Sequence, residues 1–138
     1  MVDVKVRAPL SVTLLLCALA VAGCGDSDTG VSSEGATVRV MLTDLGLLLQ
    51  ELQTENRPIP TSQAEMDQYE PLRPTVNLGL ISGDIVYQWG AGINPAGGNT
   101  VLAYEKKAPT EGGWVLMQDG TVKQMAADEF KLAPKASR

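Results

Sequence analysis

The feature that most constrains the fold is a stripe of large apolar residues between positions 38 and 52. Its members recur every three or four residues: Val38, Met41, Leu42, Leu45, Leu48, Leu49 and Leu52. This spacing places them on one face of an α-helix. Pro58 disfavours helical geometry in the residue before it, so we expect the helix to end near Glu55–Asn56. Such a stripe is either the core face of a domain or a partner-binding surface, and a core face is the more common case.

The residues after this helix predict a short helix followed by strands. Ser62 and Glu65 have the spacing of a capping box, which predicts a helix as far as about Tyr69. Residues 77–83 fit either a turn of helix or a loop. Strand-forming residues then recur at 85–89, 100–105, 114–118 and 121–124, and residues 126–132 suit a terminal helix with Phe130 as its buried anchor.

Asp119-Gly120 predicts a hairpin between the last two of these strands. A two-residue type I′ turn needs positive φ at both central positions, and Asp-Gly is one of the pairs that favours it. This turn would pair Met117 with Val122 and Leu116 with Lys123.

The N-terminal residues resemble the signal of bacterial lipoproteins. A basic start, Lys5 and Arg7, precedes a mostly apolar stretch at 10–22, which is too short to cross a bilayer as a helix and fits a secretory signal. The stretch ends in Val21-Ala22-Gly23-Cys24, which is similar to a lipobox. The resemblance implies acylation of Cys24 and cleavage by signal peptidase II between Gly23 and Cys24. The alternative is an ordinary signal peptide with a chance cysteine beside its cleavage site.

The cysteine content agrees with the lipoprotein interpretation. Cys17 lies inside the apolar stretch and leaves with the signal, so Cys24 is the one cysteine of the mature chain and has no internal disulfide partner. Two or more acyl chains on this residue give a stable bilayer anchor. We therefore expect a cell-envelope protein, anchored to the inner or outer membrane, with its domain outside the cytoplasm.

This interpretation divides the chain into four segments. Residues 1–23 are the lipoprotein signal peptide, and residues 24–36 are a flexible tether, because they are rich in Gly, Ser and Asp. Residues 37–133 form a single small domain, and residues 134–138 form a tail. The predicted fold class is α+β, with an N-terminal amphipathic helix packed on a small antiparallel β-sheet, a C-terminal hairpin and a short helix.

Charge and histidine content exclude several classes of function. The chain has sixteen acidic and eleven basic residues, a net charge of −5, and no histidine. A net-acidic chain lacks the positive surface that nucleic-acid binding needs. Without histidine there is no imidazole base for a Ser or Cys triad and no imidazole ligand for zinc. The adjacent carboxylates of Asp128-Glu129 point different ways on a short helix. We expect no catalytic residues, no metal site and no cofactor, and therefore not an enzyme.

Three aromatic residues in the strands are candidates for a ligand surface: Trp89, Tyr87 and Tyr104. Trp114 also lies in an apolar strand, and for both tryptophans burial in the core or an interface is the more common case. Lys106-Lys107 either contacts an anionic partner or protects a strand edge.

Two stretches resemble the C-terminal β-region of type II secretion pseudopilin-like proteins of planctomycetes. They are Val101-Leu102-Ala103-Tyr104-Glu105-Lys106 and Val115-Leu116-Met117-Gln118-Asp119-Gly120-Thr121-Val122, and Asn56-Arg57-Pro58-Ile59-Pro60 is similar to the Gly-x-x-Pro step of that family. The resemblance implies a helix packed on a small antiparallel sheet, and it implies no activity. The chain departs from the family in having a lipobox in place of the pilin processing motif. It also has Thr121 where the family has a histidine.

The sequence predicts a non-catalytic lipoprotein of the cell envelope. We expect it to be anchored in the bilayer through acylated Cys24, and we expect its pseudopilin-like domain to interact with another envelope protein. The alternative is a lipoprotein that binds a small ligand or carbohydrate. Buried tryptophans and an open strand edge would favour the first function, and a tryptophan beside a concave surface would favour the second.

Overall fold

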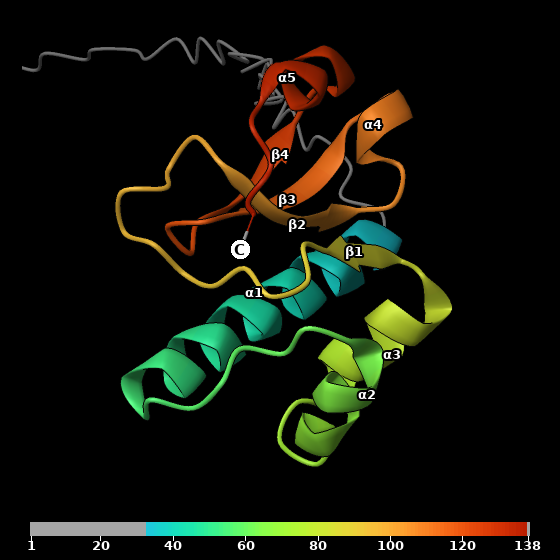
Figure 1. Cartoon of the computed structure of the whole chain (residues 1–138). Helices are drawn as coiled ribbons and strands as arrows, with labels where there is room; N and C mark the ends of the chain where they lie inside the picture. The colour runs from blue at the N-terminus through green and yellow to red at the C-terminus, as the bar shows by residue number, and fades with distance from the viewer. Residues whose placement is uncertain (1–32, 138) are drawn as a thin grey trace, which may run out of the picture.

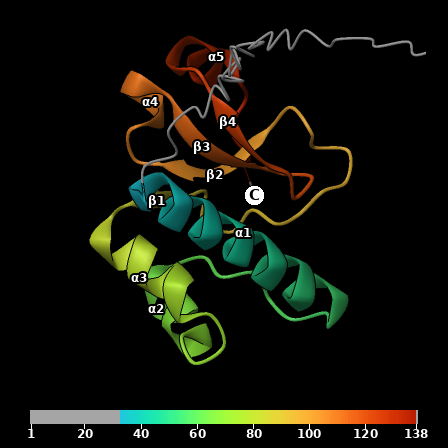
Figure 2. The ribbon, with the colours of Figure 1, turned by 180° about the vertical axis from the view of Figure 1, so that it is seen from behind.

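The computed structural model describes residues 33–137, which form three layers (Figure 1). The elements in chain order are α1 (Ser33–Thr54), α2 (Gln63–Met66), the 3₁₀ helix η1 (Asp67–Tyr69), α3 (Pro74–Ser82), β1 (Ile85–Tyr87), β2 (Val101–Glu105), α4 (Ala108–Glu111), β3 (Gly113–Met117), β4 (Val122–Met125) and α5 (Ala127–Leu132). The strands form one antiparallel sheet in the order β1-β2-β3-β4. The long helix α1 covers one face, and α4 and α5 pack against the other (Figures 1 and 2). The predicted α+β class is confirmed.

The apolar stripe of α1 is the main component of the core. Every stripe residue is buried, and Leu42, Leu45, Leu49 and Leu52 have no exposed surface. Burying one such side chain stabilises a fold by roughly 1.5–3 kcal/mol. Gly46 lies on the sheet side of the helix, where a Cβ atom would be 3.1 Å from Leu116 Cδ1 of β3, so its missing side chain lets helix and sheet approach closely. The interpretation of the stripe as a core face is confirmed.

The end of α1 is a Schellman motif, close to the predicted position. Asn56 has a positive φ of 54°. The backbone N–H of Asn56 donates to Gln53 O (3.2 Å), and that of Arg57 donates to Leu52 O (2.8 Å). These two bonds satisfy carbonyl groups that a helix end otherwise leaves unpaired.

The predicted domain boundaries are too narrow at both ends. The helix α1 begins at Ser33, inside the segment 24–36 that we interpreted as a tether, and Gly35 is buried. Gly35 lies one turn before Val38 on the buried side, but it adds no apolar side chain to the pattern that marks the helix in the sequence. Residues 134–136 are not a loose tail. Val101 N donates to Pro134 O and Ala136 N donates to Val101 O, both at 2.8 Å, so this segment pairs with β2 beyond the end of β1.

The ambiguous residues 77–83 belong mostly to a helix. Pro74 occupies the start of α3, where its missing N–H costs no helical hydrogen bond, and Gly83 ends the helix with a φ of 78°. A Cβ atom on Gly79 would lie 2.7 Å from Met41 Sδ, so the small residue allows α3 to pack closely on α1. Ser62 caps α2 as predicted, because its Oγ accepts a hydrogen bond from Glu65 N, and the Glu65 carboxylate accepts one from Thr61 N (2.7 Å).

The Asp119-Gly120 hairpin is present, but the predicted register is wrong by one residue. Leu116 pairs with Val122, and Met117 N donates to Thr121 O (2.8 Å), so the loop has three residues. Gly120 has a φ of 91°, whereas Asp119 keeps a negative φ. A type I turn followed by a left-handed glycine gives this loop, and it replaces the two-residue type I′ turn expected from the dipeptide.

No helix within residues 33–137 has both the length and the hydropathy needed to cross a bilayer.

Candidate ligand-binding cleft around Glu105

Glu105, the last residue of β2, is the one charged residue that is buried among those whose side chains the structure describes. Its Oε2 accepts a hydrogen bond from the backbone N–H of Trp114 (2.9 Å). Its Oε1 lies 3.2 Å from Lys107 Nζ, and the Lys107 side chain is 47 % exposed. A buried carboxylate needs such partners because removal from water disfavours its charge. Glu105 is therefore held between a fixed backbone donor and a cation that extends into solvent.

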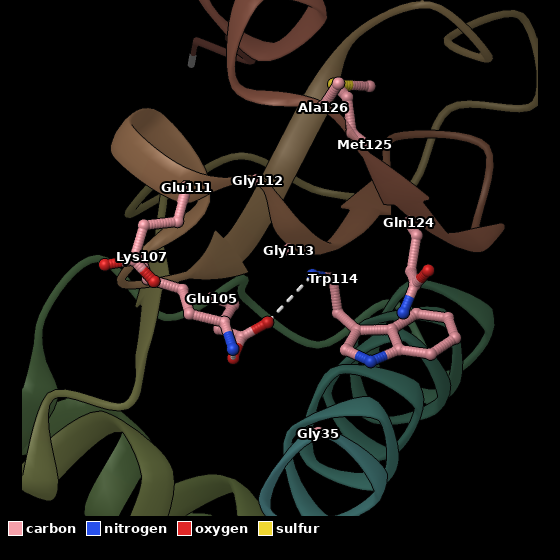
Figure 3. A pocket seen from close by; sticks show the side chains of 10 residues that line it. All are labelled: Gly35, Glu105, Lys107, Glu111, Gly112, Gly113, Trp114, Gln124, Met125 and Ala126. Atoms are coloured by element: carbon pink, nitrogen blue, oxygen red, sulfur yellow. Dashed lines mark hydrogen bonds and ion pairs between the residues drawn. The ribbon is translucent and has the colours of Figure 1, made fainter. Parts of the chain in front are cut away.

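Two hollows open on either side of this carboxylate and share Glu105 and Lys107; together we call them the Glu105 cleft. The first, of about 410 Å³, is lined by Gly35, Glu105, Lys107, Glu111, Gly112, Gly113, Trp114, Gln124, Met125 and Ala126. The second, of about 630 Å³, is lined by Thr37, Val38, Met41, Asp84, Glu105, Lys106, Lys107 and Thr110. The first turns of α1, the end of β2 and the short helix α4 contribute to the walls. Figure 3 shows Glu105 at the centre of the first hollow, with Trp114 and Gln124 to one side and Lys107 and Glu111 to the other.

Two consecutive glycines shape the wall between α4 and β3. Gly112 has a φ of 79°, and a Cβ atom on it would lie 2.8 Å from Met125 O. A Cβ atom on Gly113 would lie 2.6 Å from Glu105 Oε2. The first glycine therefore makes the sharp turn into β3, and the second leaves room for the carboxylate to reach the N–H of Trp114.

Trp114 forms the aromatic wall of the first hollow and is partly exposed. The guanidinium of Arg39 lies 5.2 Å from the centre of its ring, a cation–π distance that holds the ring in place. Gln124 is the cross-strand partner of Trp114 in β4, so an amide lies beside the indole. An aromatic surface next to an amide and carboxylates suits a ligand with one flat apolar side and several hydroxyl groups.

The cleft carries both signs of charge and no cluster typical of metal binding. Asp84, Glu105 and Glu111 are its acids, and Lys106 and Lys107 its bases. No group of three or more His, Cys, Asp or Glu side chains within the described part of the chain is placed to hold a metal ion. The arrangement is suited to binding a polar or zwitterionic ligand.

The three aromatic residues predicted as a ligand surface do not form one. Tyr87 is buried on the α1 side of the sheet, where its O–H donates to Ala91 O and its ring packs edge-on against Trp89 at 5.0 Å. Tyr104 lies on the other face, 4.7 Å from the ring of Phe130. Tyr87 pairs with Ala103 and therefore shares its face of the sheet. Tyr104, the next residue of β2, points to the opposite face, because successive residues of a strand alternate.

Burial of Tyr87 has a chemical consequence, because it raises the pKa of the hydroxyl above its ordinary value. A buried phenol with a raised pKa stays neutral and serves as a hydrogen-bond donor in the core. Tyr87 therefore supports the fold and does not face a ligand.

The structure also places the predicted charged pairs. Asp128 and Glu129 contact different lysines: Lys131 lies 3.1 Å from Asp128, and Lys123 lies 3.5 Å from Glu129. Lys106 and Lys107, for which the sequence left open an anionic partner or protection of a strand edge, line the Glu105 cleft. Gly23 and Cys24, the predicted cleavage and lipidation site, lie outside the described residues.

The comparisons with known proteins give no family for this chain. No family model, no curated protein and no solved structure matches it. The functional argument therefore rests on the sequence and on the Glu105 cleft.

Sequence analysis missed Glu105 and Trp114 as a pair. Two signals in the chain point to them. Glu105 is a charged residue in a strand whose other positions are mostly apolar, and Gly112-Gly113 directly precedes Trp114. A glycine pair that opens a strand indicates that something approaches the backbone closely.

Proposed function

We propose that this protein is a bacterial lipoprotein, anchored in a membrane of the cell envelope through acylated Cys24, whose domain is a non-catalytic module that binds a small ligand in the Glu105 cleft. The observation that carries the binding function is the position of Trp114, partly exposed on the wall of a hollow that also holds a buried carboxylate.

The anchor is supported by the sequence Val21-Ala22-Gly23-Cys24 and by the single cysteine of the mature chain. The test is the intact mass of the protein purified from its own membranes. We expect a diacylated or triacylated chain that begins at Cys24, and an uncut precursor for the Cys24→Ser variant. Normal processing of Cys24→Ser would contradict the anchor.

The ligand class that the cleft supports best is a carbohydrate. The partly exposed indole of Trp114 offers apolar surface for one side of a sugar ring, and Gln124, Glu105 and Glu111 offer acceptors and an amide for hydroxyl groups. A domain displayed in the envelope is exposed to cell-wall glycans, whose sugars carry N-acetyl and hydroxyl groups.

The probe for this proposal is a tetramer of N-acetylglucosamine, titrated while tryptophan fluorescence is recorded. We expect a saturable change that Trp114→Phe abolishes and Glu105→Gln weakens at least tenfold. Trp89→Phe is the matched control, because Trp89 is partly buried but does not line the cleft. No saturable response, or a response that Trp114→Phe leaves intact, would contradict carbohydrate binding at this site.

Interaction with a partner protein is the second candidate, and the edge strand β4 favours it, since an edge strand offers backbone groups to a further strand. Its four residues include Lys123, and both short length and an edge lysine are typical of strands that avoid such pairing. Crosslinking in intact cells, followed by comparison of the wild type with a Val122→Pro variant, tests this candidate.

A further inference from the structure

We propose that one face of α3 inserts its exposed apolar side chains into the surface of the bilayer that holds the anchor. This inference rests on the proposed acylation of Cys24. We define the α3 face by two residues, Leu78 and Ile81, which are 62 % and 66 % exposed. They are three residues apart and therefore lie on one side of the helix. The opposite side packs inward through Val76 and Gly79.

The composition of α3 suits an apolar environment. Its nine residues, Pro74–Ser82, include no charged side chain. Single exposed leucines are common on soluble proteins and need no explanation. Two exposed apolar side chains on one face of an uncharged helix are a stronger indication of a contact surface. The position of α3 relative to the anchor indicates what this surface contacts.

The helix α3 runs antiparallel to α1, which brings its end to the start of α1. Thr75, near the beginning of α3, donates a hydrogen bond to Asp44 in the middle of α1 (2.5 Å). Gly79, one turn later, contacts Met41, one turn earlier in α1. Ile81 therefore lies beside the first turns of α1, and Figures 1 and 2 show the two helix ends side by side.

The chain between Cys24 and Ser33 is short. It contains eight residues, 25–32. A fully extended chain spans at most about 3.3–3.6 Å per residue, so the start of α1 stays within roughly 30 Å of the acylated cysteine. That distance is comparable to the diameter of a domain of this size. The end of the molecule that carries the α3 face is therefore held at high effective concentration beside the bilayer.

Charge at this end gives no net attraction to anionic lipid, so apolar insertion is the expected source of affinity. Lys106 N donates to Asp84 O (2.9 Å), which places Lys106 directly after the end of α3 in space. Lys106 and Lys107 can reach lipid phosphates with their long side chains. Asp84, Glu105 and Glu111 at the same cleft offset their two positive charges. We therefore expect contact with neutral phosphatidylcholine as well as with anionic lipid.

The cysteine content makes a direct test available. Once Cys24 is acylated and the signal is removed, an introduced cysteine is the one free thiol of the chain. We would prepare acylated Ile81→Cys, label it with an environment-sensitive fluorophore and reconstitute it in phosphatidylcholine vesicles that contain brominated lipid. The matched control is Leu132→Cys on α5, since Leu132 is 88 % exposed and lies on the opposite side of the sheet from α1 and α3.

The expected result is a blue-shifted emission, quenched at least twofold by brominated lipid, at position 81 and neither effect at position 132. Raising the salt concentration should leave the quenching at position 81 unchanged. Equal emission without quenching at both positions, in protein that is acylated and floats with the vesicles, would overturn the α3 face and leave the anchor intact. A mass that shows no acyl chains would overturn the anchor and this inference together.

Discussion

The side-chain amide of Gln53 forms two hydrogen bonds with the backbone of Ile93, donating from Nε2 to Ile93 O (3.0 Å) and accepting at Oε1 from Ile93 N (2.7 Å). The amide thus bonds both backbone groups of Ile93, as a residue of a neighbouring β-strand would. These two bonds attach the long loop between β1 and β2 to the end of α1. Gly92 lies against the same amide, where a Cβ atom would be 3.1 Å away. The loop that connects the two strands is thereby ordered without secondary structure of its own.

Gln53→Ala should lower the free energy of unfolding by about 1–2 kcal/mol, because both backbone groups of Ile93 lose their protein partner. Urea unfolding followed by tryptophan fluorescence measures this change. The matched control is Gln50→Ala, one turn earlier on α1 and exposed. A variant at position 53 as stable as the one at position 50 would show that the loop does not depend on this amide.

Gly113→Ala should be destabilising by about 1–3 kcal/mol, because its new methyl group would displace the Glu105 carboxylate from the N–H of Trp114. The same substitution in a Glu105→Ala chain should lower the free energy of unfolding by less, because the carboxylate that the methyl group would displace is absent. Urea unfolding of the wild type, the two single variants and the double variant gives the coupling free energy between positions 113 and 105. We expect it to lie between about 0.5 and 3 kcal/mol. Purely additive effects would contradict the assigned contact.

Gly120→Ala should destabilise the hairpin by about 1 kcal/mol, because a φ of 91° strains any residue with a Cβ atom. No atom lies within 4 Å of the Cβ position, so the cost comes from the backbone alone. Gly120→Asn should therefore cost less than Gly120→Ala, since asparagine tolerates positive φ better. Equal melting temperatures for the glycine and alanine chains would contradict the three-residue loop.

The stability of the protein should fall as the pH rises above 10. The hydroxyl of Tyr87 has an ordinary pKa of 10.0 in the unfolded chain, and burial raises that pKa in the folded chain. Above pH 10 the unfolded state therefore binds fewer protons than the folded state, and the free energy of unfolding decreases by up to about 1.4 kcal/mol per pH unit.

Tyr87→Phe is the control for this pH dependence. It removes the titrating group and the bond to Ala91 O, so it should lower stability at pH 8 and make the fall above pH 10 shallower. Urea unfolding at pH 8, 10 and 11 measures both effects. Parallel curves for the two proteins above pH 10 would contradict the assignment to Tyr87.

The parts of the fold that the sequence predicted are those in which side-chain pattern alone determines structure. The stripe from Val38 to Leu52 predicted α1 and its buried face because, apart from Gly46, the buried positions in this range carry large apolar groups. The start of α1 was missed because Gly35, although buried, adds no hydrophobic signal. The helix α3 was ambiguous because its apolar residues lie on both its buried and its exposed sides.

The Glu105 cleft could not be predicted because it depends on contacts between distant residues. Whether Glu105 is buried follows from a glycine eight positions later and from the first turns of α1, some seventy positions earlier. The register of the hairpin could not be predicted for a related reason. Asp119-Gly120 fits both a two-residue and a three-residue loop. The three-residue loop pairs Leu116 with Val122, so Val122 packs on the α1 side of the sheet, where a two-residue loop would place Lys123.

The close contact between Gly46 and Leu116 also bears on the order in which the molecule folds. The two residues are 70 positions apart, so the side of α1 that faces β3 is uncovered until β3 has been synthesised. Contacts of such long sequence separation slow folding, because a large loop must close before they form. A nascent chain of this kind keeps the β3-facing side of its longest helix uncovered until more than three quarters of the 138 residues have been synthesised. A chain that folds this late stays extended long enough for the export that the proposed anchor at Cys24 requires.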